Sequence, residues 1–179
     1  AALKLNKLDR NKQADITIID KNDYHTLLTE LHEVAGNRVS EDAVRIPLHK
    51  IFKFTRVKPI CDNITEYDFE NNMVKSATKA YPYDYLVLAM GSTPNFYGVK
   101  GLAEHAFTLW SLKDAVTIRD HVRECFVKAS TEADSAARKK LLTFAVIGAG
   151  FTGVEMIGEL ARWTRSLAHE YGVDKNEMR

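Results

Sequence analysis

The alternation of apolar and polar positions divides the first part of the chain into helical and extended segments. Apolar residues recur at helical spacing in segments 1–8, 23–37 and 111–129, so each is predicted to form a helix. The segment ADITIID, residues 14–20, alternates with period two and predicts a strand that ends at Asp20. Because segment 1–8 begins without a capping residue, we interpret it as the end of a helix that starts earlier.

The middle of the chain changes to extended patterns. Residues 42–54 contain Pro47, which limits any helix there to short pieces. Residues 57–89 follow period two around an Asn-Asn hairpin turn at 71–72, which predicts a small β-meander. The apolar run YDYLVLAMG at 83–91 predicts a strand that is buried on both faces.

The last part of the chain combines a polar connection with a strand, a glycine-rich turn and a helix. Ser111 and Asp114 resemble a capping box at the start of the preceding helix. Residues 130–140 are polar and lack an apolar stripe, so we expect a solvated connection. LLTFAVIGAGFTGVEMIGEL, residues 141–160, then predicts strand, turn and helix. Alternating strands and helices around a small meander indicate an α/β architecture.

The turn between this strand and helix fits the pattern G-x-G-x-x-G with Gly148, Gly150 and Gly153. In that pattern the first glycine permits a tight turn, the second lets the backbone approach a pyrophosphate, and the third lets the helix pack on the strand. The free N–H groups and the dipole of the new helix then hold the phosphate charge. A glycine turn without a ligand is the alternative, but the strand and helix around the motif favour a dinucleotide.

A dinucleotide-binding unit also needs an acidic residue for the ribose, about 20 residues past the turn at the tip of the next strand. Glu170 and Asp174 lie near that distance, but neither follows an apolar strand, so we reject both. Asp20 does stand at a predicted strand tip after a helix. The N-terminal segment therefore resembles a second nucleotide-binding unit whose glycine turn would precede Ala1, with an ordinary strand-end Asp as the alternative.

Composition narrows the class of protein. The net charge of +1 gives no indication of nucleic-acid binding or of a polybasic membrane anchor. The longest apolar runs fall short of the roughly 20 residues that a bilayer-spanning helix needs. Cys61 and Cys125 fit neither a disulfide framework nor a metal site, which indicates a reducing, cytoplasmic setting.

Four stretches together resemble the flavin-dependent pyridine-nucleotide oxidoreductases, and most closely the type II NADH:quinone dehydrogenases. They are ITIIDKNDYHTLLTELHEVAG, YDYLVLAMGSTPNFYGVKGLAEHAF, SLKDAVTIRDHV and LLTFAVIGAGFTGVE, in the order of the family. The resemblance implies a Rossmann-like FAD/NAD(P)-binding three-layer sandwich with a small β-meander, incomplete at both ends. It divides the chain into a partial FAD-binding domain, 1–105, and the start of an inserted NADH-binding domain, 106–179.

The same resemblance assigns residues to the flavin. Asp20 would bind the adenosine ribose of FAD, and Ile64 would lie near the adenine. The segment LAMG, with Ala89 and Gly91, would pass the flavin as a second contact. The helix LTELHEVAG, residues 28–36, would approach the isoalloxazine ring.

A further set is assigned to NADH. The resemblance implies that the turn holds its pyrophosphate through Gly148, Gly150, Phe151, Thr152 and Gly153. Glu155, in the first turn of the helix, would act as the catalytic residue near the contact between flavin and nicotinamide. A carboxylate at that position is also favoured by the helix dipole alone, which is the structural alternative.

Cysteine and histidine positions help to define the subclass. Disulfide reductases of this superfamily place an active cysteine after the ribose-binding acid, and residues 21–50 contain none. Cys61 and Cys125 are better explained as small buried residues of the meander and of the helix. His25 and His32 lie seven residues apart, but no third ligand completes a metal geometry, so we expect no metal site.

The resulting functional prediction is an FAD-dependent NADH dehydrogenase that passes hydride from NADH to FAD and on to a quinone. The parent protein would be peripheral on the cytoplasmic face of the membrane, and the resemblance allows a homodimer. We expect the chain itself to be inactive, as part of a longer protein. Two alternatives stay open: a related flavoenzyme that reduces a ferredoxin or a small disulfide, and a catalytically silent nucleotide-binding or redox-sensing module.

Overall fold

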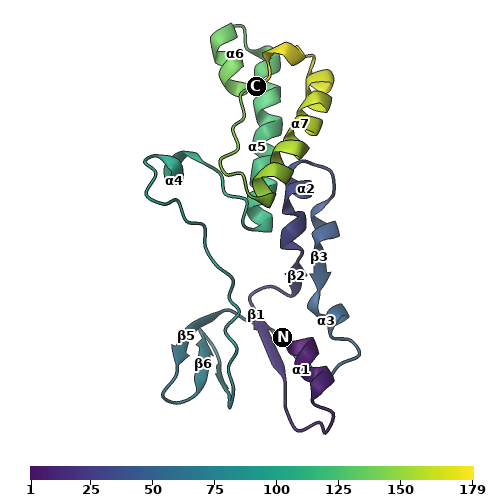
Figure 1. The fold of residues 1–179 in the computed structure, drawn as a ribbon, viewed down its shortest axis with the longest axis vertical. Coiled ribbons are helices and arrows are strands. Elements are labelled where there is room, and N and C mark those ends of the chain that lie inside the picture. The colour runs from purple at the N-terminus through teal and green to yellow at the C-terminus, as the bar shows by residue number, and fades with distance from the viewer. The chain divides into compact units, whose positions relative to one another are not determined.

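The computed structural model describes all residues, 1–179, and the chain divides into two compact units. The first unit comprises Ala1–Thr26 and Arg45–Ser92, and the second comprises Leu27–Val44 and Thr93–Arg179. Each unit is therefore assembled from two separate segments of the chain, whose course can be followed by colour in Figure 1.

The first unit holds short strands and two short helices. Its elements are α1 (Ala2–Leu8), β1 (Thr17–Asp20), β2 (Tyr24–Thr26), β3 (Arg45–Pro47), α3 (Leu48–Ile51), β4 (Lys58–Cys61), β5 (Ile64–Asp68), β6 (Met73–Ser76) and β7 (Ala80–Pro82). β1 and β4 pair in parallel with Asp20 opposite Cys61, so the prediction of a strand ending at Asp20 is confirmed. A small core supports this pair and consists of Ile16, Leu48, Phe52 and Val57.

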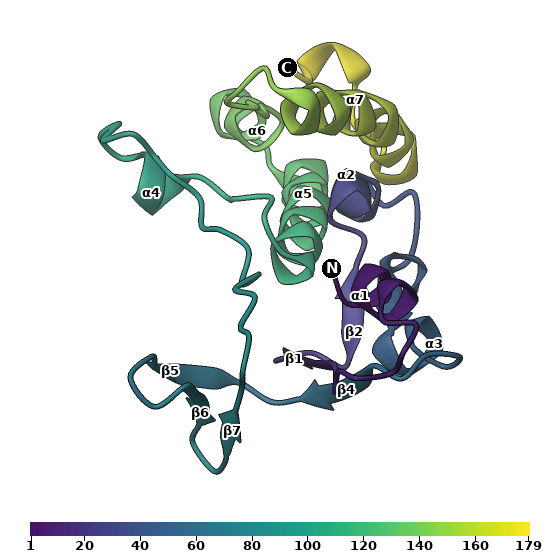
Figure 2. The same cartoon turned by 60° about the horizontal axis from the view of Figure 1, so that its bottom comes forward.

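The predicted β-meander forms a three-stranded antiparallel sheet in the order β5-β6-β7 (Figure 2). The turn between β5 and β6 contains Asn72 with φ of 52°, a conformation that Asn tolerates better than most residues. The interpretation of Cys61 is wrong on two points: its strand β4 pairs with β1 outside the meander, and the residue is exposed.

The second unit is helical. Its elements are α2 (Leu31–Ala35), α4 (Leu102–His105), α5 (Leu112–Thr131), α6 (Ser135–Leu141) and α7 (Phe151–Tyr171), with 3₁₀ turns at Leu28–Glu30, Glu41–Val44 and Lys175–Glu177. α5 contacts α2, α6 and α7, and the apolar core lies among these helices (Figures 1 and 2). No helix of the chain is both long and apolar enough to cross a membrane.

α5 follows its sequence signals closely. Ser111 Oγ accepts from the N–H of Asp114 at 3.2 Å, and Asp114 Oδ2 accepts from the N–H of Ser111 at 2.9 Å, so the capping box is confirmed. Helical spacing predicts a buried stripe of Ala115, Ile118, Val122 and Phe126; three of these are buried, and Ile118 is half-buried. Cys125 is also buried on this helix, as expected.

The prediction of one helix over 23–37 is only partly correct. Tyr24–Thr26 forms β2 and pairs antiparallel with β3, so cross-strand pairing overrides the local helical spacing there. The α-helix is confined to Leu31–Ala35, and it ends at Gly36 and Asn37 as predicted. Asn37 adopts φ of 52° and stops the helix.

Two predicted strands do not form. Residues 83–91 form no strand, and Tyr85 is 95% exposed. Residues 143–149 also form no strand, although the N–H of Phe144 donates to Arg179 O and the N–H of Arg179 donates to Leu142 O. An apolar run becomes a buried strand only where neighbouring strands satisfy its backbone, and β1 and β4 pair only with each other.

The connection predicted at 130–140 contains a helix. α6 begins after Asp134, whose Oδ1 accepts from the N–H of Ala136 at 3.0 Å. Arg138 forms a bidentate ion pair with Glu177 at 2.6 and 2.7 Å and thereby ties α6 to the C-terminal turn. The helix has no buried residue, but Leu141 at its end packs against the apolar core, so this contact and the ion pair both hold it.

We expect Phe126→Ala to destabilise the protein strongly because Phe126 is fully buried and stacks on Phe144. Loss of this ring should lower the free energy of unfolding by about 3–5 kcal/mol, measured by denaturant unfolding. The neighbouring Val127→Ala is the control, since Val127 is 46% exposed. Equal effects of the two changes would show that the core does not depend on the Phe126 ring.

Candidate functional site

The glycine-rich turn before α7 has the tight geometry that its sequence predicts. Gly148 adopts φ of 109°, a conformation that only glycine enters readily. A Cβ atom at Gly153 would overlap the carbonyl oxygen of Gly148, so the first turn of α7 packs directly on the backbone of the loop. The turn thus brings together Gly148, Gly150 and Gly153. Gly148 is needed for its positive φ, and Gly153 is needed because a side chain there would overlap the loop.

The N-terminus of α7 lacks a side-chain cap. Gly150 is the N-cap residue and supplies no side-chain acceptor. The first N–H groups of the helix, among them those of Phe151 and Thr152, are therefore available to an external acceptor. Together with the positive end of the helix dipole, they form a site suited to an anion such as phosphate.

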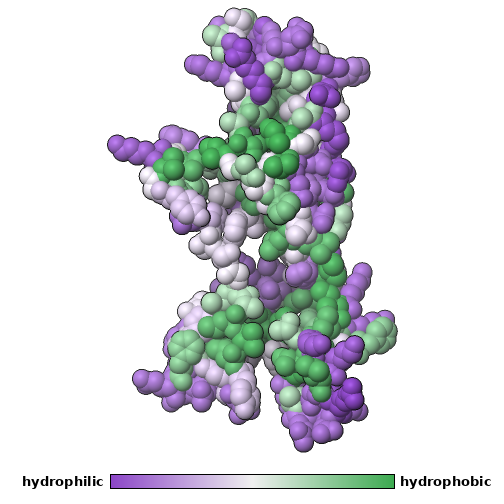
Figure 3. Space-filling model, viewed as in Figure 1, coloured by the Kyte–Doolittle hydropathy of each residue, from purple (hydrophilic) through white to green (hydrophobic).

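Apolar side chains surround this helix start. Ile147 is 71% exposed, Phe151 is 90% exposed and Val154 is 60% exposed. Figure 3 shows apolar surface on the unit that contains α5 and α7, as well as on the first unit. An exposed group of apolar residues beside an anion site suits a ligand that has both rings and phosphates.

A cavity of about 270 Å³ lies where α7 begins. It is lined by Leu28, Thr29, Leu31, His32, Phe151, Thr152 and Glu155. Within it, Nδ1 of His32 lies 3.4 Å from Oε2 of Glu155, so an imidazole from α2 faces a carboxylate from α7. The His32 side chain is 12% exposed and the Glu155 side chain 47% exposed, which leaves the carboxylate accessible from the cavity.

α2 and α7 meet again one turn further along. A Cβ atom at Gly36 would lie only 2.5 Å from Cβ of Glu159, so the two helices approach closely at this point. The buried Glu159 carboxylate is held by Arg38 Nη1 at 2.9 Å and by Arg162 Nη2 at 3.0 Å. Arg162 Nη2 also donates to the Gly36 carbonyl at 2.9 Å and so joins both helices.

The histidines are placed differently from what their spacing indicates. His25 lies on β2 and is exposed, so it shares no helical face with His32. Ligand atoms of Glu30, His32 and Glu33 do lie within 4.8 Å of one another, which the sequence did not predict. Glu33 is engaged by Arg38 and His32 by Glu155, so this group gives no argument for a metal.

The residues assigned to the flavin are divided between the units: Asp20, Ile64, Ala89 and Gly91 lie in the first, and the segment 28–36 lies in the second. Asp20 is half-buried at the end of β1, and its Oδ1 accepts from the N–H of Asn22 at 2.9 Å, which fixes the carboxylate at the strand tip. Ile64 begins β5 and is also half-buried. Ala89 and Gly91 lie on the exposed, extended segment rather than on the strand that the sequence predicted.

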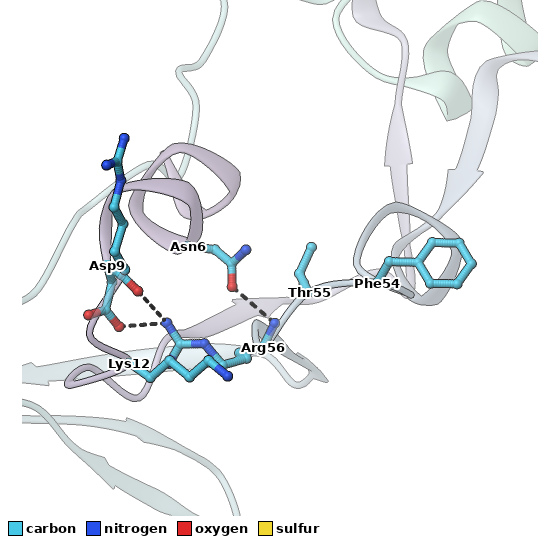
Figure 4. Close-up of a pocket in the computed structure, with 7 residues that line it drawn as sticks. Asn6, Asp9, Lys12, Phe54, Thr55 and Arg56 are labelled. Carbon is cyan, nitrogen blue, oxygen red and sulfur yellow. Dashed lines mark hydrogen bonds and ion pairs between the residues drawn. The ribbon is translucent and has the colours of Figure 1, made fainter.

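A second cavity, of about 410 Å³, lies in the first unit at the C-terminal end of α1 (Figure 4). Asp9 and Arg56 form its wall, with Arg56 Nη2 at 2.6 Å from Asp9 Oδ2 and at 3.0 Å from Asp9 O. Asn6 Oδ1 accepts from the backbone N–H of Arg56 at 3.0 Å. These bonds tie the helix to the loop before β4, so this cavity is primarily a structural junction.

Sequence reasoning singled out Glu155 but missed its partner His32, and it missed the buried Glu159 entirely. Glu155 and Glu159 are four residues apart, as are His32 and Gly36. Such i, i+4 pairs share a helical face, which was the available signal. This spacing does not reveal that the two helix faces pack on each other, because the packing depends on contacts between residues more than 120 positions apart.

The family model described as pyridine nucleotide-disulphide oxidoreductase matches residues 1–171. The type II NADH:quinone oxidoreductase of Staphylococcus haemolyticus is 35% identical over 178 residues, which is 98% of this chain and 43% of that protein. The chain thus spans less than half the length of this curated relative.

Solved structures share the fold. NDH2 from Plasmodium falciparum in complex with NADH matches with a TM-score of 0.82 and 22% identity, over 93% of this chain and 36% of that one. The sulfide:quinone oxidoreductase from Aquifex aeolicus matches with a TM-score of 0.63 and 21% identity, over 97% of this chain and 46% of that one. The Rossmann-like fold predicted from the sequence is therefore confirmed.

Acid should weaken the junction of Figure 4. The Arg56 guanidinium and the N–H groups of Gln13 and Ala14 lower the pKa of Asp9 from 3.8 to about 2. A lowered folded-state pKa stabilises the fold above pH 3.8 and loses this effect as the pH falls towards 2. Asp9→Asn should therefore reduce the midpoint of thermal unfolding at neutral pH and flatten its decline in that window.

The control is Asp15→Asn, since the Asp15 side chain is 88% exposed. Hydrogen bonds also lower the pKa values of Asp62 and Asp68, so the comparison must be between variant and wild type at each pH. An unchanged acid profile in Asp9→Asn would contradict this assignment.

We expect Gly153→Ala to displace the turn, because the added Cβ would overlap the Gly148 carbonyl. Overpacking of this kind lowers the free energy of unfolding by about 1–3 kcal/mol. Gly158→Ala on the same helix is the matched control, because a Cβ there meets nothing within 4 Å. If the two changes have the same effect on denaturant unfolding, the close contact is not needed.

Proposed function

Because the chain belongs to the pyridine nucleotide-disulphide oxidoreductase family, we propose that it serves in an FAD-dependent NADH dehydrogenase whose electrons pass to a quinone. The observation that carries this proposal is the glycine turn that opens on the uncapped N-terminus of α7, with Glu155 one turn away in a cavity. The names of the curated relatives and of the NADH-bound structural neighbour support it.

The residues of the turn fit the pyrophosphate of NADH. The N–H groups at the start of α7 supply donors, and Gly148 and Gly153 leave no side chain between loop and helix. We assign the pyrophosphate to Gly148, Gly150 and Gly153 with the backbone of Phe151 and Thr152. The exposed ring of Phe151 lies beside this position and would cover one face of the ligand.

The adenosine ribose of the flavin is assigned to Asp20 in the first unit. The fixed carboxylate of Asp20 at the tip of a parallel strand suits a ribose, whose hydroxyls donate to it. Ile64, Ala89 and Gly91 stay our candidates for further contacts. On this proposal residues 1–105 belong to the flavin domain and 106–179 to the NADH domain.

Bound FAD would accept a hydride and supply the redox chemistry. Oxidation of NADH by a quinone consumes one proton beyond the hydride, since NADH, a quinone and a proton give NAD⁺ and a quinol. Glu155 Oε2 and His32 Nδ1 can hold a proton between them in the cavity. Glu155 is therefore our candidate catalytic residue, and its negative charge also favours the positive charge that develops on the nicotinamide.

A thiol acceptor is disfavoured by the placement of both cysteines. Cys125 is buried on α5, and its burial raises the pKa of the thiol, so it is poorly suited to nucleophilic chemistry. Cys61 is exposed on β4, and neither residue lines the cavity at Glu155. This favours a diffusible acceptor such as a quinone, and we further propose peripheral attachment to the cytoplasmic face of the membrane.

The test is to purify the full-length protein with FAD and to measure its flavin absorbance and its oxidation of NADH with a quinone. We expect both, and we expect Glu155→Gln to keep flavin binding while it slows flavin reduction by about 10- to 100-fold. Glu170→Gln, an exposed change on the same helix, is the control.

Each other outcome is informative. A full rate in Glu155→Gln would assign Glu155 to the helix dipole alone. A preference for ferredoxin or a small disulfide over quinones would change the acceptor, and a protein that binds no flavin would be a silent nucleotide-binding module.

A further inference from the structure

α2 and α7 pack against each other along an interface, called the seam below, that contains two contacts one above the other. His32 faces Glu155, and Gly36 faces Glu159. Because both pairs are four residues apart on their own helices, the two contacts lie one helical turn from each other. The contact at Gly36 is buried, and the contact at His32 opens into the cavity.

Ion pairs as well as close packing stabilise the contact between Gly36 and Glu159. Glu159 is 7% exposed, and a buried carboxylate is costly unless cations and donors compensate it. Arg38 reaches one oxygen at 2.9 Å and Arg162 the other at 3.0 Å. Since Arg162 also bonds the Gly36 carbonyl, the carboxylate, the guanidinium and the backbone of α2 form one fixed group.

The distance between α2 and α7 at Gly36 determines whether His32 can contact Glu155. Any side chain at Gly36 would begin 2.5 Å from the Glu159 Cβ, so the backbone of one helix would have to move. His32 and Glu155 are already 3.4 Å apart, close to the limit of a polar contact. A small displacement at Gly36 therefore separates the imidazole from the carboxylate.

We propose that Gly36, Glu159 and Arg162 are positioning residues that hold Glu155 against His32 and so set the rate of hydride transfer from NADH. None of the three lines the cavity, so they act through the seam and not on the ligand. The inference rests on the proposed function in assigning the reaction. The dependence of the His32–Glu155 contact on Gly36 is a structural statement and does not rest on the proposed function.

The main variant is Gly36→Ala in the flavin-loaded full-length protein, with Gly158→Ala as the matched control. Gly158 lies next to Glu159 on α7, and a Cβ there meets nothing. We expect Gly36→Ala to slow flavin reduction by NADH about tenfold or more, with kcat falling and KM little changed. Glu159→Gln, which keeps the volume but loses the charge, should act in the same direction, and Gly158→Ala should leave the rate unchanged.

A double-mutant cycle separates positioning from mere stability. In a His32→Asn background, Gly36→Ala should have little further effect on the reduction rate, because the contact it disturbs is already lost. Its effect on the midpoint of thermal unfolding should persist in that background. Equal slowing in both backgrounds would overturn the proposal, as would an unchanged rate in Gly36→Ala alone.

A readout without activity tests the structural part. The imidazole NMR signals of His32 should shift in Glu155→Gln, and Gly36→Ala should shift them in the same sense while Gly158→Ala does not. If Gly36→Ala leaves them unchanged, the seam does not control the contact. If the shift occurs but the protein oxidises no NADH, the proposed function fails while the coupling between the two contacts stands.

Discussion

The arrangement of the second unit depends on the close approach of α2 to α7 at Gly36. A carboxylate as buried as that of Glu159 is tolerated in a protein interior only when its charge is compensated. Arg38 and Arg162 compensate it, and the missing side chain of Gly36 makes room for it. Since a helix as short as α2 is not stable by itself, this contact and the apolar core together keep it in place.

A second missing side chain, at Gly153, positions the first turn of α7. At Gly153 the first turn of α7 rests on the Gly148 carbonyl, just as α2 rests on Glu159 at Gly36. Both contacts fall within the first nine residues of α7, and Glu155 lies between them. The loop and α2 therefore fix α7 on two sides, and the position of Glu155 follows from both. The Glu155 carboxylate is exposed and makes few polar contacts itself, but these two helix contacts give it a defined position.

The sequence allowed the locally determined parts of this arrangement to be predicted. The capping box at Ser111, the stop at Gly36 and the glycine turn depend on residues within a few positions of one another, and all three are confirmed. Residues 83–91 and the segment just before Gly148 were predicted as strands from their apolar character, but strand formation depends on partners elsewhere. The seam was missed for the same reason, since the partners of Gly36 lie on α7, more than 120 residues away.

The two long helices of the second unit show why α7 and not α5 is the candidate for binding a ligand. At the start of α5, Ser111 and Asp114 satisfy the terminal N–H groups within the chain. At the start of α7, Gly150 provides no acceptor, and the surrounding side chains are exposed. Glycine at an N-cap is only a few tenths of a kcal/mol less stabilising than Ser or Asp, so the absence of a side-chain acceptor costs α7 little stability and leaves its N–H groups free. Replacing Gly150 by Ser or Asp would also place a side chain where the proposed function needs the backbone to approach a pyrophosphate. The uncapped terminus, rather than the glycine pattern alone, therefore links this sequence to nucleotide binding.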